Sequence, residues 1–292
     1  MTSAMAFKAF CIEQRIKGNS DKTIKYYGYC VNPLIDFLGK DFEIEEITIL
    51  NLKQYVFSLQ DKNIASNTIK SYVKGIKAFI SWLYKENYIF EDLSAKLALP
   101  KAEKKVINVL TDNEIKKLFS VFNTKTFVGI RNYCICALML DSGLRKNEVV
   151  RMQLSDLHIA ENYVIVKGKG NKQRIVPLGL KSQKYLVKYM VMRPAFVVSK
   201  ALFLTKNYEP IKQGTIDKEF KKLKKVFLTR RIYPHLLRHT FATRYLENGG
   251  NIYALQQILG HSSLDMVQKY VHLTQSKNAV YFTNFSPLDN IS

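Results

Sequence analysis

Helical periodicity dominates the first hundred residues of this 292-residue chain. Apolar side chains recur at helical spacing in four segments, and no run of β-forming residues interrupts them. Ser20 stands where its side chain can cap the start of the second segment. Because each segment has one apolar face, the four can bury a common core as a small bundle. The predicted helices span residues 4–17, 20–38, 47–59 and 66–84.

The periodicity breaks between residues 92 and 109, where Pro100 separates a short apolar run from a basic one. The residue before a proline is pushed away from helical backbone angles, so this stretch is typical of an extended linker. A new helix is indicated at Thr111, because Glu114 follows at the spacing of a capping box. We therefore predict a helical domain at 1–97, a linker at 98–109 and a second domain at 110–292, which ends in a tail.

The second domain combines one hairpin with helices. Two β-rich runs, 163–166 and 174–178, flank a cluster of glycine, asparagine and lysine at 167–172, which suits a tight turn. Helical patterns return beyond residue 213, at 215–227, 234–247, 251–259 and 263 to about 275. The expected fold class is mainly α with a small β-hairpin or sheet: a helical N-terminal domain followed by a mixed α+β domain.

The chain is strongly basic, with 45 Lys and Arg against 24 Asp and Glu and a formal net charge of +21. Such an excess calls for a polyanionic partner, and nucleic acid is the leading candidate. No apolar run approaches the length of a membrane span, and the first residues lack a signal-peptide pattern. We expect a soluble, cytoplasmic, nucleoid-associated protein whose four scattered cysteines are reduced thiols and which holds no metal.

Lysine clusters are the candidate sequence-independent DNA contacts. Residues 218–225 form a basic amphipathic helix, and three lysines of the fourth predicted helix share one face. A merely solvated face is the alternative for residues 218–225. The predicted contacts are Lys70, Lys74, Lys77, Lys167, Lys172, Lys221, Lys222 and Lys225.

A candidate anion site begins at Pro234, which opens a helix at the position where its missing N–H costs little. His235 and Arg238 then lie on one face of the first turn. The fork of guanidinium donors matches phosphate oxygens, and the positive end of the helix dipole adds attraction. A solvated or capping His and Arg pair is the ordinary alternative.

Three further residues stand next to helix boundaries. His261 follows a glycine that ends one helix, and Tyr270 lies nine positions on, in the next helix. A buried core residue is the ordinary interpretation of such a tyrosine. Arg145 follows a glycine break and is a second candidate phosphate clamp. Glu148 is either a carboxylate on the helix surface or a partner that orients the Arg145 guanidinium.

Taken together, these residues resemble the tyrosine recombinases, which include the phage integrases and the Xer chromosome-dimer resolvases. The resemblance covers nearly the whole chain, and the predicted helical domain is similar to the family's core-binding domain. No arm-site-binding module is expected before it. Five motifs stand in the family's order and spacing: Ser142-Gly-Leu-Arg145, Gly168-Lys-Gly-Asn-Lys172, His235-x-x-Arg238-His-Thr-Phe-Ala-Thr243, Leu259-Gly-His261 and Tyr270.

The resemblance implies that Tyr270 attacks a DNA phosphate, forms a 3′-phosphotyrosyl link and releases a 5′-hydroxyl. Arg145 and Arg238 would hold the non-bridging oxygens, and His261 would donate another hydrogen bond. Lys169 would protonate the leaving oxygen, with Lys167 and Lys172 as alternatives, and His235 would be the base for the tyrosine. Neither ATP nor a metal or other cofactor is expected.

The implied partners are double-stranded DNA with specific core sites and three further copies of the chain. Family members act as tetramers on two duplexes and exchange strands through a four-way junction, and we expect the two domains to close around DNA. The biological task is left open between integration, excision and resolution, with a mobile element favoured. The alternatives are a type IB topoisomerase-like relaxing enzyme and a DNA-binding relative without activity.

Overall fold

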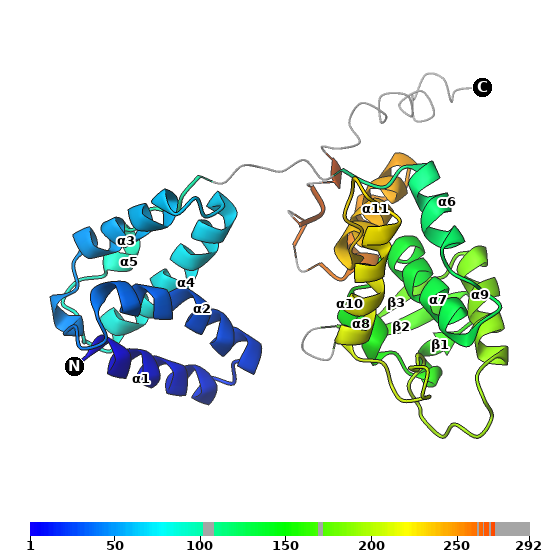
Figure 1. Cartoon of the computed structure of the whole chain (residues 1–292), viewed down its shortest axis with the longest axis horizontal. Coiled ribbons are helices and arrows are strands. Elements are labelled where there is room, and N and C mark those ends of the chain that lie inside the picture. Colours follow the sequence, from blue (N-terminus) through cyan, green and yellow to red (C-terminus); the bar gives the residue numbers. More distant parts are fainter. Residues whose placement is uncertain (102–107, 169–171, 262, 265, 269, 272–292) are drawn as a thin grey trace, which may run out of the picture. The chain divides into compact units, whose positions relative to one another are not determined.

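The computed structural model describes residues 1–101, 108–168, 172–261, 263–264, 266–268 and 270–271. The chain divides into two compact units, Met1–Val106 and Ile107–Ser292. The division falls inside the predicted linker. Figure 1 shows a first unit made only of helices and a second unit in which helices surround a small sheet. The mostly helical fold class predicted from the sequence is therefore confirmed.

The first unit contains four main helices, as the apolar periodicity predicts. Side chains of Thr2, Ser20 and Thr48 cap three of them by accepting hydrogen bonds from backbone N–H groups. The elements are α1 (Ser3–Ile16), α2 (Asp21–Leu38), the 3₁₀ turn η1 (Ile44–Glu46), α3 (Ile49–Asp61), α4 (Ser66–Lys85) and the short α5 (Leu93–Lys96).

Aromatic side chains fill the centre of this bundle. The Phe10 ring meets Tyr27, Phe79 and Trp82 edge to face, with ring centroids 4.9, 5.5 and 5.4 Å apart. Such pairs stabilise a fold beyond the burial of their area. The aromatic cluster therefore joins α1, α2 and α4 into one core.

The second unit holds the candidate catalytic residues. It begins with α6, whose Thr111 and Glu114 form the predicted capping box. Its elements are α6 (Asp112–Ser120), α7 (Phe127–Asp141), α8 (Lys146–Arg151), η2 (Leu154–Asp156), β1 (Leu157–His158), β2 (Tyr163–Lys167), β3 (Gln173–Pro177), α9 (Leu180–Val191), α10 (Gln213–Lys222), η4 (Leu223–Lys225), α11 (Pro234–Glu247) and α12 (Ile252–Leu259).

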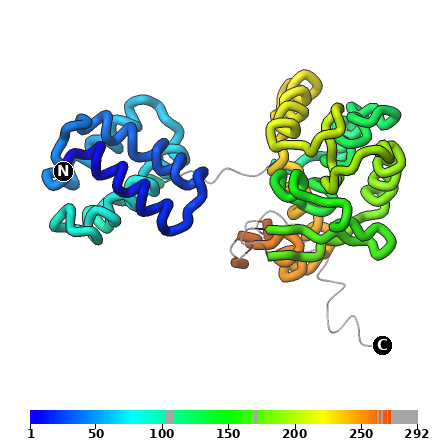
Figure 2. Tube along the Cα trace, turned by 90° about the horizontal axis from the view of Figure 1, so that it is seen from below, coloured from blue at the N-terminus to red at the C-terminus, as the bar shows by residue number. Residues whose placement is uncertain are grey.

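The sheet is antiparallel, with strand order β1-β2-β3. Val164, Val166 and Val176 point into the core, whereas Ile175 is exposed on the other face. The helix α12 packs against β3 (Figure 2), α8 packs against β2, and α7 packs against α9 and α11. This packing brings the C-terminal end of α12 beside β3 and the start of α8.

The hairpin and the helices α10, α11 and α12 follow the sequence prediction, although α10 ends at Lys222 and continues as a 3₁₀ turn. The helix α9 and the strand β1 were not predicted. Of the helix expected at 263 to about 275, residues 266–268 and 270–271 are helical, whereas 263–264 form a bend and a turn, so the helix begins later than predicted; the remaining positions lie outside the described residues. Within the described ranges, no helix has the length and apolar character needed to cross a bilayer.

The turn between α7 and α8 depends on Gly143. Its φ of +64° is in the left-handed region, and a Cβ there would lie 2.5 Å from Phe241 Cδ1 and 2.9 Å from Leu259 Cδ2. Both neighbours belong to the core, so neither can move away cheaply. The glycine therefore permits close packing of this turn against α11 and α12.

A Gly143→Ala substitution should destabilise the protein by about 1–3 kcal/mol, through overpacking and an unfavourable φ. Thermal unfolding would report this as a lower Tm. Gly214→Ala is the matched control, because a Cβ at Gly214 would have no neighbour within 4 Å and the φ of this residue is not positive. An equal loss of stability in both variants would contradict the packing argument.

Candidate active site

The site begins at the N-terminus of α8, where Arg145 is the capping residue. Its backbone N–H donates to Glu148 Oε2 at 2.8 Å, and its Nη1 donates to Glu148 Oε1 at 2.9 Å. Glu148 is only 5% exposed, whereas the side chain of Arg145 is 34% exposed. The carboxylate thus holds the arginine from the buried side, as one of the two predictions for Glu148 required.

A second guanidinium binds the same carboxylate. Arg174 of β3 donates from Nη1 to Glu148 Oε1 at 2.8 Å and from Nη2 to Oε2 at 2.9 Å. This bidentate pair is the geometry in which an arginine binds a carboxylate most strongly. Arg174 was not among the predicted site residues, and its position in a β-rich run gave no signal of its own.

Arg238 lies one turn into α11 and is 4% exposed. Its Nη1 donates to Gly143 O at 2.5 Å, and its Nη2 lies 2.9 Å from His261 Nε2. A guanidinium has only donors, so Nε2 accepts this bond and the other ring nitrogen, Nδ1, carries the proton of the neutral ring. The His261 backbone N–H donates to Gln256 O at 3.2 Å, which fixes the turn after α12.

The C-terminal end of α12 gathers all three arginines. Its last carbonyls lack partners within the helix and carry the negative end of the helix dipole. Each of three consecutive carbonyls accepts a bond from a different guanidinium: Ile258 O from Arg174 Nε at 2.7 Å, Leu259 O from Arg238 Nη2 at 2.7 Å, and Gly260 O from Arg145 Nη2 at 3.3 Å.

The site is therefore electropositive. Burial, together with the charge of the neighbouring Arg145, lowers the pKa of Arg238 to about 9. Burial alone would raise the pKa of Glu148, but hydrogen bonds and charge from Arg174, together with the bonds from Arg145, hold it below its usual value. Glu148 thus stays ionised at neutral pH, and its single negative charge only partly compensates the three positive guanidinium groups. An anion bound at this place would relieve the excess.

Tyr270 lies within electrostatic range of Arg238 and Arg145, but it is 1% exposed. Burial raises the pKa of its phenol to about 12, although the two arginines oppose the shift. The phenol oxygen lies 2.6 Å from His239 Nδ1. The centroid of the His239 ring lies 5.6 Å from that of Tyr270 and 6.5 Å from that of the exposed His235. Sequence reasoning passed over His239, because its contact joins residues 31 positions apart.

Other predicted residues lie elsewhere or outside the described part of the chain. Lys169 is outside it. Lys167 pairs with Asp156 at 3.5 Å, and Lys77 Nζ donates to Leu97 O at 2.9 Å. The remaining predicted DNA contacts are mostly exposed: Lys74, Lys172, Lys221, Lys222 and Lys225 are exposed, and Lys70 is partly buried. Lys222 also pairs with Glu219 at 2.9 Å.

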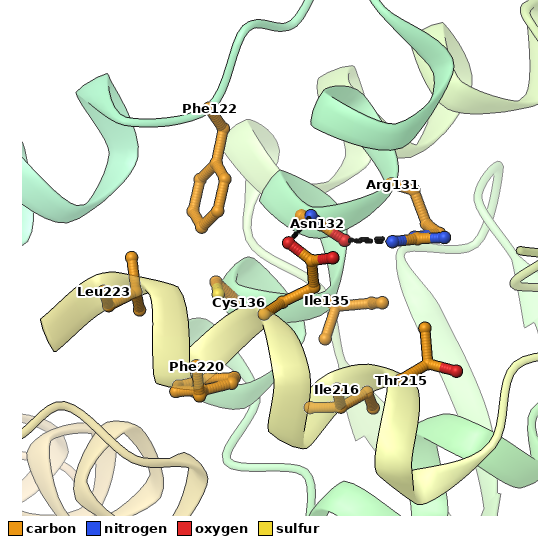
Figure 3. Close-up of a pocket in the computed structure, with 10 residues that line it drawn as sticks. Phe122, Arg131, Asn132, Ile135, Cys136, Thr215, Ile216, Phe220 and Leu223 are labelled. Carbon is orange, nitrogen blue, oxygen red and sulfur yellow. Dashed lines mark hydrogen bonds between the residues drawn. The ribbon is translucent and has the colours of Figure 1, made fainter. Parts of the chain in front are cut away.

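Figure 3 shows a cavity between α7 and α10 that contains none of the predicted site residues. Apolar side chains line most of it, and Asn132 links Arg131 to Glu219 at one side. This arrangement compensates the buried Arg131 charge. Among the described residues, no group of three or more His, Cys, Asp or Glu side chains is placed to hold a metal ion.

Comparison with known proteins identifies the family. The family described as "Phage integrase family" matches residues 108–277, and the "Phage integrase, N-terminal SAM-like domain" matches residues 7–89. Tyrosine recombinase XerD of Staphylococcus saprophyticus is 32% identical, covering 93% of this chain and 94% of its own length. Tyrosine recombinase XerC of Bacillus pumilus is 31% identical, covering 89% and 88%. The chain belongs to the phage integrase family and is a tyrosine recombinase.

Solved structures show the same fold. The XerA recombinase crystal structure is 28% identical, with a TM-score of 0.54 and coverage of 97% of this chain and 99% of that one. The Tn1549 transposon integrase in complex with a circular intermediate DNA has a TM-score of 0.76 at 21% identity, covering 92% and 95%. At that identity the second likeness concerns the fold alone.

The excess charge predicts that a small oxyanion stabilises the protein. Sulfate, compared with chloride at equal ionic strength, should raise the Tm, by about 2–4 °C for each kcal/mol of binding free energy. An Arg238→Gln substitution should remove most of this rise. Arg193→Gln is the control, because that guanidinium bonds the backbone carbonyls of Ser199 and Leu202. An unchanged sulfate effect in Arg238→Gln would contradict an anion site here.

Proposed function

We propose that this recombinase cleaves and rejoins DNA at specific core sites through a 3′-phosphotyrosyl link to Tyr270. The observation that supports this most is the set of three guanidinium groups around one carboxylate, with the Tyr270 phenol inside the electrostatic range of two of them, Arg145 and Arg238. A backbone phosphodiester is the anion that a basic DNA-binding protein would bring to such a place.

Arg145 and Arg238 are the phosphate-binding cations in this proposal. Their fixed donors would stabilise the charge that develops on the non-bridging oxygens as the phenol attacks. Both are held before substrate arrives, Arg145 by Glu148 and Arg238 by the carbonyls of Gly143 and Leu259. His261 is the further hydrogen-bond donor in this proposal, and its ring lies beside Arg238, with Nε2 2.9 Å from Arg238 Nη2.

The phenol needs a proton acceptor, because its pKa of about 12 keeps it protonated at neutral pH. His239 Nδ1 is hydrogen-bonded to it, and the His235 ring is the next in line. The assignment of His235 as the base stays a prediction. In a proton relay from Tyr270, His239 would receive the proton first and His235 would be the next acceptor.

Lys169 remains the proposed acid for the leaving 5′-oxygen, on the connection between β2 and β3. An ammonium group carries the proton that an alkoxide needs, and a hairpin tip can approach a bound phosphate. Lys167 and Lys172 at the two sides of the tip are the alternatives.

The proposed partners are two DNA duplexes held by a tetramer of this chain, which exchanges one pair of strands at a time through a four-way junction. Lysines on α4 and α10 would supply salt-sensitive phosphate contacts. The relatives' names include Xer recombinases and a transposon integrase. The proposed task is integration, excision or resolution of a mobile element.

A nicked suicide substrate tests the nucleophile. Wild-type protein should become covalently attached to the 3′ end of the cleaved strand, whereas Tyr270→Phe should give no adduct and should retain DNA binding. Gel electrophoresis under denaturing conditions measures the adduct. An adduct of equal yield in Tyr270→Phe would refute the assignment. Relaxation of supercoiled plasmids without any core site would favour the topoisomerase alternative.

A substrate with a sulfur leaving atom tests the acid. A 5′-bridging phosphorothiolate leaves as a thiolate and needs no proton, because a thiol is far more acidic than an alcohol. Lys169→Ala should cleave ordinary DNA about 10²–10⁴-fold more slowly and recover on the sulfur substrate. Lys167→Ala and Lys172→Ala are the matched controls. Rescue of either control, without rescue of Lys169→Ala, would move the acid role to that lysine.

A further inference from the structure

Strand alternation explains where the Arg174 side chain lies. In β3, Val176 is buried and Ile175 is exposed, so residue 174 shares the inward face with Val176. Arg174 is paired in register with Val166 of β2, whose side chain is also buried. The arginine therefore points from the sheet toward α12 and α8.

Arg174 joins three separate segments of the chain. All three of its guanidinium nitrogens donate: Nε to Ile258 O at the end of α12, and Nη1 and Nη2 to the two carboxylate oxygens of Glu148 in α8. With only 13% of its side chain exposed, it is the more buried of the two arginines on Glu148. Its donors are engaged with the protein rather than directed at a ligand.

Glu148 depends on this partner. A buried carboxylate is costly unless it is paired and hydrogen-bonded. Arg145 alone supplies one side-chain bond and one backbone bond, whereas Arg174 supplies two charge-assisted bonds. Without Arg174, the carboxylate that orients Arg145 would lose its main support.

The backbone leaves space for this guanidinium. Gly260 has a φ of +60°, and a Cβ there would lie 3.2 Å from Cδ, Nε and Nη1 of Arg174. The carbonyl of the same glycine accepts from Arg145 Nη2. A residue without a side chain therefore allows both arginines to approach the turn that carries His261.

We propose that Arg174 is a positioning residue that fixes Arg145 and the His261 turn relative to the β2–β3 hairpin. It acts through Glu148 and Ile258 and does not touch the phosphate. This role rests on the proposed phosphotyrosyl chemistry and adds a structural connection between the hairpin and the phosphate-binding arginines. The strand that leads from the hairpin tip, where the proposed acid stands, is tied to the cations that hold the scissile phosphate.

The test is the rate of adduct formation on the suicide substrate at saturating DNA. Arg174→Gln should lower this rate about 10–100-fold, because small displacements of catalytic groups are costly. DNA affinity should change less than about threefold, since one of many phosphate contacts is affected indirectly. Arg174→Lys keeps the charge but loses the fork geometry of the guanidinium. Its rate should therefore lie between the rates of wild type and Arg174→Gln.

Controls separate positioning from general damage. Arg193→Gln removes another partly buried guanidinium of the same unit and should leave the rate within about twofold of wild type. Rates are compared below the unfolding transition of every variant. If Arg174→Gln does not fold, Arg174→Lys carries the test.

A double-mutant cycle with Glu148→Gln identifies the route. Residues that act through one contact are strongly non-additive. Arg174→Gln should therefore lower the rate by no more than about threefold in the Glu148→Gln background. Full additivity of the two effects would show that Arg174 does not act through Glu148 and would overturn the proposal.

The pH profile gives a readout that a scaffold role would not change. Glu148 faces Arg145, Arg174 and Arg238, and burial acts against its charge. Removing Arg174 should raise the pKa of Glu148, so its protonation begins at a higher pH. The adduct-formation rate of wild type divided by that of Arg174→Gln should grow as pH falls. The rate of Glu148→Gln divided by that of the double variant should not change with pH.

Failure of the inference and failure of the proposed function give different results. If wild-type protein forms no adduct, the phosphotyrosyl chemistry fails. If wild-type protein forms an adduct that depends on Tyr270, but Arg174→Gln and Arg174→Lys keep the wild-type rate and pH profile, only the role of Arg174 is refuted.

Discussion

The convergence of three arginines on the last carbonyls of α12 is the interaction on which the site depends. Like charges repel, so they stay together only where the surroundings supply compensating negative charge. Here the compensation consists of one buried carboxylate and three consecutive carbonyls at the negative end of a helix. It is sufficient to hold the guanidinium groups in place and insufficient to neutralise them. The remaining positive charge is what a phosphodiester can satisfy, and the same geometry would stabilise it further as charge develops during attack.

The proposed nucleophile, Tyr270, is held differently from the cations. The arginines are fixed by bonds to the protein, whereas the Tyr270 phenol is buried and bonded to His239. Its raised pKa means that the protein without DNA keeps the phenol protonated and unreactive at neutral pH. In the proposed mechanism, this phenol must then meet a phosphate and lose its proton to an acceptor.

Local pattern predicted much of the fold and part of the site. Capping residues and apolar spacing indicated α1–α4, α6 and α10–α12, because those signals lie within a few residues of one another. The helix α9 was missed, since its buried face includes Ser182, whose hydroxyl donates to Asp141, and the apolar period is thereby masked. Arg174 and His239 were missed for a related reason. Their roles come from contacts with residues 26, 84 and 31 positions away, which a local pattern does not contain.

In the proposed mechanism, the arginine cluster delivers a DNA phosphate to one particular tyrosine among 17. The most direct measurement is peptide mapping by mass spectrometry of the protein trapped on a suicide substrate, after digestion with nuclease and trypsin. The nucleotide-bearing peptide should span residues 270–277 and carry its phosphate on Tyr270. Attachment to any other tyrosine, or to a serine or a histidine, would contradict it.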